Sequence, residues 1–343
     1  MSAINKNNNF GFLRLLFAAL VIFSHSPELI DGNRNREILT YMFGTISLGE
    51  LAVDGFFLIS GYLILKSFYA SNSLKNYILK RCFRIYPAFI VAYLICMLIV
   101  ASLALGIDIL GKITILEWLK SIAKMLLLDR PHVESVFAGN HYQEINGSMW
   151  TIRYEFLCYM VIPVFAYLGI YKKPYYFFTV LFLMCLLFYN NMSNTRFGLP
   201  LAFEFSQIVR LLLVFLIGGC FHVFKDEISW DKHYAVISFI ALIICLNIKL
   251  IAELGLLIFG AYLLFYFALH YQNKMLNGVG VKTDISYGIY LYAWPIQSLF
   301  VQYVPTIAPY QLNIITLVLT SLLAYMSWSF IEKPFIRLKG KLL

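Results

Sequence analysis

Long apolar stretches separated by short polar connections run along the whole chain. A helix that crosses a bilayer needs about 20 residues, most of them apolar. Stretches near this length lie at about 10–30, 45–66, 83–106, 148–171, 175–191, 206–224, 233–250, 252–271, 283–303 and 310–331. The pattern predicts an all-α integral membrane protein with about ten transmembrane helices. No polar linker or long loop divides the stretches, so we expect a single transmembrane domain, residues 1–343, in the form of one helical bundle.

One further segment, at about 113–129, has a different pattern. Its sequence is ITILEWLKSIAKMLLLD, in which Glu117, Lys120 and Lys124 form one charged face at i, i+3 and i+7. A charged face on an otherwise apolar helix is typical of a helix that lies on the membrane interface. We therefore expect an interfacial helix in the third outer segment and no additional crossing.

The distribution of lysine and arginine predicts the orientation. With ten spans and a cytoplasmic N-terminus, about 16 basic residues fall on the inner side and about 8 on the outer side, which is the excess expected of cytoplasmic loops. The inner groups are Lys66 to Arg84, Lys172 with Lys173, and the segment from Lys333. Both termini are therefore expected in the cytoplasm. The net charge of +9 then reflects topology and anionic membrane lipids, and it does not imply nucleic-acid binding.

The composition excludes a soluble protein, because 61% of the 343 residues are apolar, 13% are charged and the mean hydropathy is +0.75. The first stretch is too long for a signal-peptide h-region and lacks a small-residue cleavage site, so we expect it to remain in the mature protein. The six cysteines show no CxxC spacing and are expected to be small packing residues. No metal-site or phosphate-loop motif is present in the sequence, and no metal is expected.

Two ionisable residues, Arg14 and His25, lie inside the first stretch, FGFLRLLFAALVIFSHSPELI. A charged side chain in the middle of a transmembrane helix costs roughly 2.5–3.5 kcal/mol on insertion scales, so such residues point to function. Eleven steps of 100° amount to three turns plus about 20°, which places both side chains on one helix face, about 16 Å apart.

Depth along the helices, at about 1.5 Å per residue, divides the ionisable residues into two layers. The outer half holds His25, Glu50, Asp54 and Glu155, and the inner half holds or borders Arg14, Arg81 and Arg84. An arginine layer suits an anionic ligand from the cytoplasm, because guanidinium groups bind phosphates bidentately. A histidine among carboxylates suits proton transfer, since a carboxylate orients a neutral imidazole that acts as a base.

Each of these residues also has a structural interpretation. Arg14 lies close enough to the interface to snorkel, and His25 alone would be an ordinary core histidine. Arg81 and Arg84 fit the positive-inside rule. Asp54 and Glu155 could pair with Arg153 or Arg210, although Glu155 and Arg153 are two residues apart and do not share a helix face.

Six motifs along the chain resemble those of the acyltransferase-3 family of membrane acyltransferases, in the family's order. They are the R-x10-H element from Arg14 to His25; DGFFLISGY, Asp54 to Tyr62, similar to FFxxSG; KRCFRIYP, Lys80 to Pro87, similar to R-x-x-R-x-x-P; SMWTIRYEFLCY, Ser148 to Tyr159, similar to W-x4-E-x3-Y; and ISYGIYLYAWP, Ile285 to Pro295, with FIEKPF, Phe330 to Phe335, similar to the two late signatures.

This resemblance implies transfer of an acyl group, usually acetyl from acetyl-CoA, to a hydroxyl of a cell-surface carbohydrate or its lipid-linked precursor, in the bacterial inner membrane. It makes His25 the catalytic residue, with Glu155 or Asp54 as its orienting partner. Arg14, Arg81 and Arg84 become contacts of the CoA donor, and Ser60, Trp150 and Tyr159, in the matched motifs, become substrate-binding residues. The family often has a histidine before Trp-Pro, where this chain has Ala293, so the chemistry falls on His25.

Several alternatives remain open from the sequence. His25 could act as a general base or carry a transient acyl group. The acceptor could be a small molecule. A solute transporter would also bury charged residues and use helix breaks, for which Pro163, Pro295, Gly61 and the pair Gly218–Gly219 are candidates, although no repeat between the two halves supports it.

Overall fold

The apolar stretches fold as helices because a helix satisfies its backbone N–H and C=O groups internally, as a lipid environment requires. A computed structural model describes residues 8–197, 203–271 and 273–342, and all regular structure in these ranges is helical. Seven helices in these ranges are long and apolar enough to cross a membrane: Phe10–Asp31, Leu48–Tyr69, Leu74–Leu105, Lys173–Ser193, Glu204–Val223, Ala252–Leu269 and Pro309–Leu338. The chain is an all-α membrane protein.

The three other predicted stretches also form helices where the sequence places them. They are α8 (Trp150–Tyr167), α11 (Lys232–Leu246) and α15 (Ser286–Tyr303). None of these three is among the seven helices that meet the length and hydropathy needed to span. The structure therefore shows seven helices suited to cross a membrane in the described ranges, and the count of about ten transmembrane helices stays a prediction.

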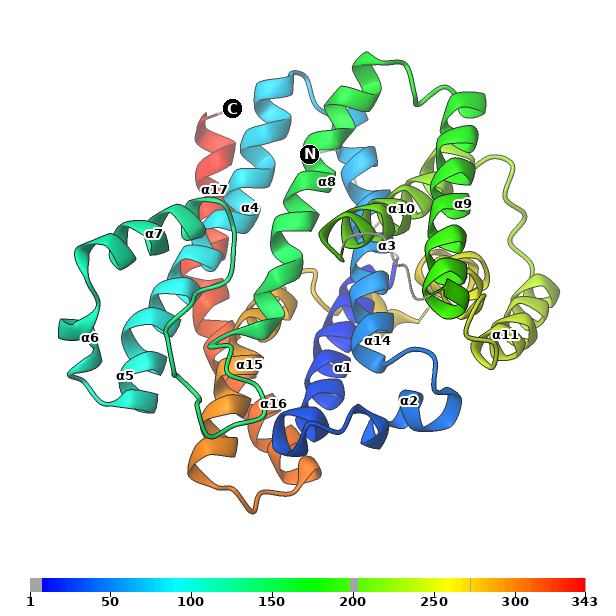
Figure 1. Cartoon of the computed structure of the whole chain (residues 1–343). Helices are drawn as coiled ribbons and strands as arrows, with labels where there is room; N and C mark the ends of the chain where they lie inside the picture. Colours follow the sequence, from blue (N-terminus) through cyan, green and yellow to red (C-terminus); the bar gives the residue numbers. More distant parts are fainter. Residues whose placement is uncertain (1–7, 198–202, 272, 343) are drawn as a thin grey trace. The chain divides into compact units, whose positions relative to one another are not determined.

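The chain divides into two compact units, each of which is described by itself. Unit 1 comprises Met1–Phe17, Leu39–Tyr77 and Tyr154–Val281, and unit 2 comprises Ala18–Ile38, Ile78–Arg153 and Lys282–Leu343. Four of the five boundaries fall inside helices, all labelled in Figure 1: α1 (Phe10–Asp31), α2 (Ile38–Phe43), α4 (Leu74–Ile95) and α8. At these four points the chain passes from one unit to the other within a helix.

Unit 1 is organised around the contact between α3 (Leu48–Tyr69) and α10 (Phe203–Val223). A Cβ added to Gly61 would lie 1.8 Å from the carbonyl oxygen of Phe215, and one added to Gly218 would lie 2.0 Å from that of Leu58. The two backbones therefore touch at both glycines, as small residues permit between membrane helices. Both glycines lie inside continuous helices and act as contact points, rather than as the helix breaks that a transporter would need.

Further helices complete unit 1. They are α2 (Ile38–Phe43), α9 (Lys173–Phe197), α11, α12 (Ala252–Gly255) continued through a π-helical turn (Leu256–Gly260) into α13 (Ala261–Leu269), and α14 (Lys274–Asn277). The start of α3 is set by Ser47, whose side chain accepts a hydrogen bond from the backbone N–H of Glu50, while the Glu50 carboxylate accepts one from the N–H of Ser47. Glu50 thus closes a capping box at the helix N-terminus.

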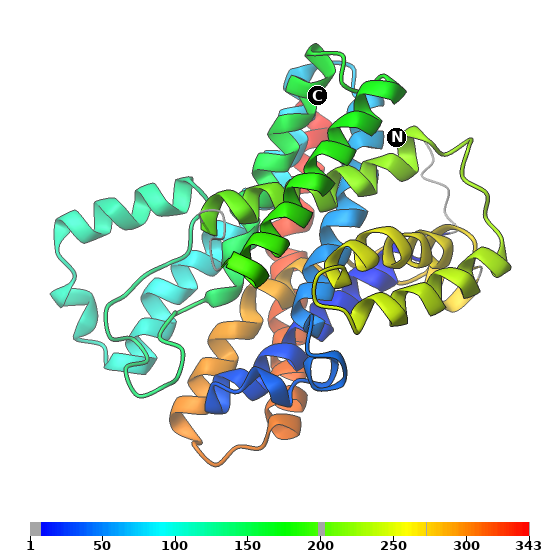
Figure 2. The same ribbon diagram turned by 45° about the vertical axis from the view of Figure 1, so that its right-hand side comes forward.

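Unit 2 is organised around the helical hairpin of α15 and α16 (Pro309–Ser327), which lie side by side in Figures 1 and 2. A Cβ on Gly288 would lie 2.7 Å from Cα of Ala324, so the two helices approach closely there. α16 continues through a π-helical turn (Trp328–Glu332) into α17 (Lys333–Leu342). α4 continues in the same way through a π-helical turn (Cys96–Val100) into α5 (Ala101–Leu105), which is followed by α6 (Ile109–Lys112).

The segment that was expected to lie on the interface forms α7 (Ile115–Leu126) in unit 2. Thr114 and Glu117 close a capping box at its start. The hydroxyls of Ser121 and Tyr93, 2.9 Å apart, join α7 to α4. Its apolar side chains, such as Leu119, are exposed in the structure. An amphipathic helix therefore exists at this place, and its position on the membrane surface stays a prediction.

Candidate active site

His25 projects from the last two turns of α1, in unit 2. Its Nδ1 lies 2.9 Å from Oε1 of Glu28, three residues further along the same helix. The imidazole is 21% exposed, whereas the carboxylate is 5% exposed. The second ring nitrogen, Nε2, makes no hydrogen bond with any residue that the structure describes. One edge of the ring is therefore held by a carboxylate and the other is available for chemistry.

The other oxygen of Glu28 is held from the turn that follows α1. Nε of Arg34 donates to Oε2 of Glu28 at 2.6 Å. Partial desolvation of the Arg34 guanidinium disfavours its charge, but the charges of Glu28 and Tyr142 and the hydrogen bonds to both residues outweigh this effect and raise the pKa of the guanidinium. His25, Glu28 and Arg34 therefore form a chain in which the central carboxylate bonds to both neighbours.

The backbone after α1 brings Arg34 back to Glu28. Gly32 adopts φ of +74° and its N–H donates to the carbonyl of Glu28 at 2.8 Å, which is a glycine termination of the helix. The side chain of Asn33 then caps the short 3₁₀ turn Arg34–Arg36. Because the chain reverses at Gly32, a residue six positions after Glu28 can reach its side chain.

Trp294 of α15 packs against the imidazole of His25. The ring centroids are 4.8 Å apart and the planes are close to perpendicular, at 71°. The indole N–H of Trp294 donates to the carbonyl of Glu144 at 3.0 Å. Nε2 of Gln297, also in α15 and fully buried, donates to the carbonyl of Ile22 and to the hydroxyl of Ser26. These contacts fix the part of α1 that carries His25 against α15.

A second group of predicted residues comes together in unit 1. The carboxylate oxygen Oε1 of Glu155 accepts a hydrogen bond from the hydroxyl of Ser60 at 2.9 Å and another from the hydroxyl of Tyr159. Tyr159 is one turn further along α8, and Ser60 is on α3. The sequence predicted all three as site residues, and the structure joins them in one cluster.

Asp54, in unit 1, is fully engaged with Arg210 of α10. Nη2 of Arg210 lies 2.8 and 2.9 Å from the two oxygens of this buried carboxylate. Nε of Arg210 donates to Glu253, and the amide of Asn191 donates to the same carboxylate. Of the two structural partners considered from the sequence, Arg210 is therefore the one that Asp54 contacts.

The predicted donor arginines lie at three places. Arg14 is half-buried on α1, in unit 1, and Arg81 is half-buried on α4, in unit 2. Arg84 donates to Asp284 at 3.0 Å and to Glu332 at 3.1 Å, and both carboxylates are buried. The donor role of Arg84 stays a prediction, but a phosphate would have to share its guanidinium with these two carboxylates.

Trp150, predicted to bind substrate, is the first residue of α8. It is half-buried in unit 2 and directly follows the 3₁₀ turn Gly147–Met149. Its neighbour Thr151 bonds to the hydroxyl of Tyr290, 2.6 Å away, and Ser148 donates to the carbonyl of the same tyrosine. The start of α8 is thus held on α15, the helix that also carries Trp294.

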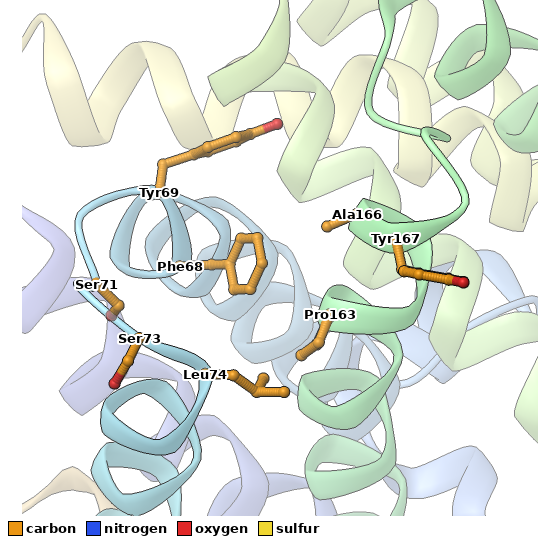
Figure 3. A pocket seen from close by; sticks show the side chains of 8 residues that line it. All are labelled: Phe68, Tyr69, Ser71, Ser73, Leu74, Pro163, Ala166 and Tyr167. Atoms are coloured by element: carbon orange, nitrogen blue, oxygen red, sulfur yellow. The ribbon is translucent and has the colours of Figure 1, made fainter.

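A pocket of about 420 Å³ opens in unit 1 between the end of α3 and the end of α8. Phe68, Pro163 and Ala166 point toward one another in Figure 3, and the other lining residues are Tyr69, Ser71, Ser73, Leu74 and Tyr167. The lining has no carboxylate, imidazole or cationic side chain, and it includes none of the predicted site residues. The pocket therefore brings none of the predicted site residues to a ligand.

Comparison with known proteins decides the class. The family model described as an acyltransferase domain, Acyl_transf_3, matches residues 7–331. The chain belongs to the acyltransferase-3 family. Two similar proteins match over nearly their full length: an "O-acetyl transferase" of Shigella phage Sf6 is 28% identical over 97% of both chains, and "Nodulation protein 10" of Rhizobium leguminosarum bv. viciae is 26% identical over 98% of this chain and 95% of its own.

A third similar protein, "Acyltransferase MdmB" of Streptomyces mycarofaciens, is 28% identical over 43% of this chain and 36% of its own length. No solved structure matches the chain. Membership of the acyltransferase-3 family makes the chain a membrane acyltransferase and confirms the resemblance carried by the six motifs.

Three residues around His25 were not identified from the sequence: Glu28, Arg34 and Trp294. Glu28 had a signal, because residues at i and i+3 on a helix are neighbours and HSPE places a carboxylate at that spacing. Trp294 directly follows Ala293, where the family often has a histidine, and the structure shows that the Trp294 ring lies beside His25. Arg34 had no comparable signal, since its contact depends on the reversal at Gly32.

Proposed function

We propose that this acyltransferase is a membrane O-acetyltransferase that moves an acetyl group from cytoplasmic acetyl-CoA to a hydroxyl of a cell-surface polysaccharide, such as O-antigen, capsule or exopolysaccharide, or of its lipid-linked precursor. The observation that carries the proposal is the imidazole of His25, which a carboxylate holds at Nδ1 and which leaves Nε2 available. The full-length similarity to a protein named O-acetyl transferase supports both the acetyl group and the oxygen acceptor.

Two routes are consistent with this arrangement. In the first, Nε2 of His25 takes the proton of the sugar hydroxyl while the hydroxyl oxygen bonds to the thioester carbon. The carbon–sulfur bond then breaks, and CoA leaves as the thiol with the proton from the imidazolium. In the second, Nε2 attacks the thioester carbon, the carbon–sulfur bond breaks and CoA leaves as the thiolate. The hydroxyl oxygen then bonds to the acyl carbon as the bond from that carbon to Nε2 breaks, and the hydroxyl proton goes to the CoA thiolate. Both routes need a free Nε2.

Other predicted residues take supporting parts. Arg14 and Arg81 are proposed to contact the CoA phosphates or the pantetheine chain. Arg84 is proposed to take part in the same contact while its guanidinium also binds two carboxylates, those of Asp284 and Glu332. Ser60, Glu155 and Tyr159 are proposed to bind substrate as the cluster that the structure joins, and Trp150 is proposed to bind substrate from the start of α8. Asp54 is left out of the chemistry, because both of its oxygens already accept hydrogen bonds from Arg210.

The proposed setting is the inner membrane of a bacterium, with about ten crossings, α7 on the membrane surface and both termini in the cytoplasm. Acetyl-CoA would then enter from the side of the basic clusters, while the acceptor would meet the outer half of the helices. The excess of basic residues on the predicted inner side supports this orientation.

Mass analysis of surface glycans from cells with and without the gene tests the proposal. We expect a mass increment of one acetyl group per modified sugar only where the gene is present, and its loss when the gene encodes His25→Ala. Equal membrane levels of the variant and the wild type are the control. Unchanged glycans, with an acetyl increment on a small molecule, would redirect the proposal to that acceptor. An expressed and folded His25→Ala variant that acetylates at the wild-type rate would overturn both chemical routes.

A further inference from the structure

The chain of contacts through Glu28 determines where the proton of His25 lies. An ionised carboxylate only accepts hydrogen bonds, and a guanidinium only donates them. Arg34 remains protonated in proteins, so its contact of 2.6 Å holds Glu28 in the ionised form. Nδ1 of His25, 2.9 Å from the other oxygen, must then be the nitrogen that carries hydrogen. In the neutral imidazole, this leaves the lone pair on Nε2.

We propose that Glu28 and Arg34 are positioning residues for acyl transfer. Glu28 selects the tautomer of His25 that presents the Nε2 lone pair. Arg34 holds the Glu28 carboxylate in place and partly offsets its negative charge. This inference rests on the proposed function, since it assigns His25 the chemistry. It holds for the base route and for the acyl-histidine route, because both use the same lone pair.

The surroundings of the ring support a fixed orientation. The imidazole and the ring of Trp294 pack nearly perpendicular to each other, with 4.8 Å between their centroids, which restricts rotation of the histidine side chain. The carboxylate of Glu28 is 5% exposed, so water competes little for it. Arg34, in contrast, is 61% exposed. The buried carboxylate of Glu28 is therefore held by His25 at one oxygen and by Arg34 at the other.

Few other charges reach this chain of contacts within unit 2. From the turn after α1, Arg36 pairs with Asp31 and is separate from Glu28. From the loop before α8, Tyr142 contacts Arg34, and His141 lies beside Gly32. From α15, Trp294 and Gln297 contribute uncharged groups. The charge balance at His25 is consequently set by Glu28 and Arg34.

Glu28 and Arg34 carry opposite charges, so removing each charge should move the pH dependence of activity in opposite directions. Removing the anion with Glu28→Gln destabilises the imidazolium, so activity should persist to lower pH, although at a reduced maximal rate. Removing the cation with Arg34→Gln leaves the anion uncompensated and stabilises the imidazolium, so activity should be lost at higher pH. A role in folding alone would not move the acid limb of the pH profile in opposite directions.

The assay uses the full chain in membranes, with radiolabelled acetyl-CoA and surface glycan from source cells that lack the gene. We expect the acid limb to move down by about one pH unit for Glu28→Gln and up by about one half to one unit for Arg34→Gln. The maximal rate should fall about 100-fold for Glu28→Gln, as expected for loss of an orienting carboxylate, and about 3-fold for Arg34→Gln. Arg34→Lys, which keeps the charge, should restore the wild-type profile.

Arg36→Gln is the matched control, because Arg36 lies on the same turn and pairs with Asp31 rather than Glu28. Its profile should equal that of the wild type. Acid limbs that stay in place, or that move in the same direction in both variants, would overturn the proposal. If Glu28→Gln fails to fold, the shift of the exposed Arg34→Gln variant decides alone. Absence of acetyl transfer by the wild type would instead overturn the proposed function. That outcome differs from an active wild type whose variants show unshifted acid limbs, which would overturn only the roles of Glu28 and Arg34.

Discussion

His25 obtains its chemical environment from a very short piece of chain and one aromatic ring. Glu28 is on the same helix turn, Arg34 is brought back by the reversal at Gly32, and Trp294 arrives from α15. A histidine inside an apolar helix would otherwise be costly. The carboxylate makes the burial of this polar ring tolerable and orients it at the same time.

The reversal at Gly32 gives a prediction at this scale. Gly32→Ala forces a side chain into the left-handed region and places its Cβ 3.2 Å from Nδ1 of His141. The unfolding free energy should fall by about 1–2 kcal/mol. The acid limb of the pH profile of activity should move to higher pH, as expected for Arg34→Gln, because the altered turn no longer holds Arg34 against Glu28. Thermal unfolding in detergent and a pH profile measure the two effects.

Gly44→Ala separates these two effects. Gly44 also has a positive φ, of +68°, but among the residues that the structure describes, its chain neighbours aside, none has a heavy atom within 4 Å of an added Cβ. This variant should lose a similar amount of stability and keep the wild-type pH profile. A Gly32→Ala enzyme with an unshifted acid limb would show that the turn does not act through Arg34.

At the scale of the elements, glycine decides how closely the helices pack. Gly61 and Gly218 let the backbones of α3 and α10 touch. Such close contact stabilises the pair through van der Waals packing, because the hydrophobic effect does not drive helices together within lipid. We predict that Gly218→Ala lowers the unfolding free energy by about 1–3 kcal/mol, as overpacking does, and reduces the melting temperature in detergent. Gly111→Ala, which meets open space, should leave the melting temperature unchanged. Equal melting temperatures for both variants would contradict the contact.

Arg84 joins three elements of unit 2, because it reaches from α4 to Asp284, before α15, and to Glu332, before α17. Arg84→Gln leaves two buried carboxylates uncompensated and should cost about 3–5 kcal/mol of stability. The double variant Arg84→Gln/Glu332→Gln should recover part of this loss, which thermal unfolding would show. A raised KM for acetyl-CoA without a change in melting temperature would instead support the predicted donor contact.

At the scale of the whole molecule, orientation follows from where basic residues lie relative to the predicted crossings. We predict that Thr306→Cys, in the α15–α16 connection, is labelled by a membrane-impermeant maleimide in spheroplasts above the background of the native cysteines. Asn72→Cys, in the α3–α4 connection, should react only after the membrane is opened. Protection of Thr306→Cys would mean an odd change in the number of crossings before it, as when α7 spans the membrane instead of lying on it.

The amino-acid sequence was sufficient to predict the helices and the family, and it identified Arg14 and His25 as candidate site residues. Apolar runs of spanning length fold as helices wherever they occur in lipid, since the backbone bonds form within each segment. Arg14 and His25 were visible because ionisable residues are costly in such a run. Glu28 was within reach of the same reasoning, since its contact with His25 spans three residues of one helix.

The tertiary structure alone decided which residues meet. Trp294 on His25, Arg210 on Asp54, and Ser60 with Tyr159 on Glu155 come from helices or turns that the apolar pattern treats as equivalent. Hydropathy records how each helix interacts with lipid, but it does not record which helix faces which or how each is rotated. That choice depends on the packing of side chains and on close contacts such as those at Gly61 and Gly218, which exist only once the helices have assembled.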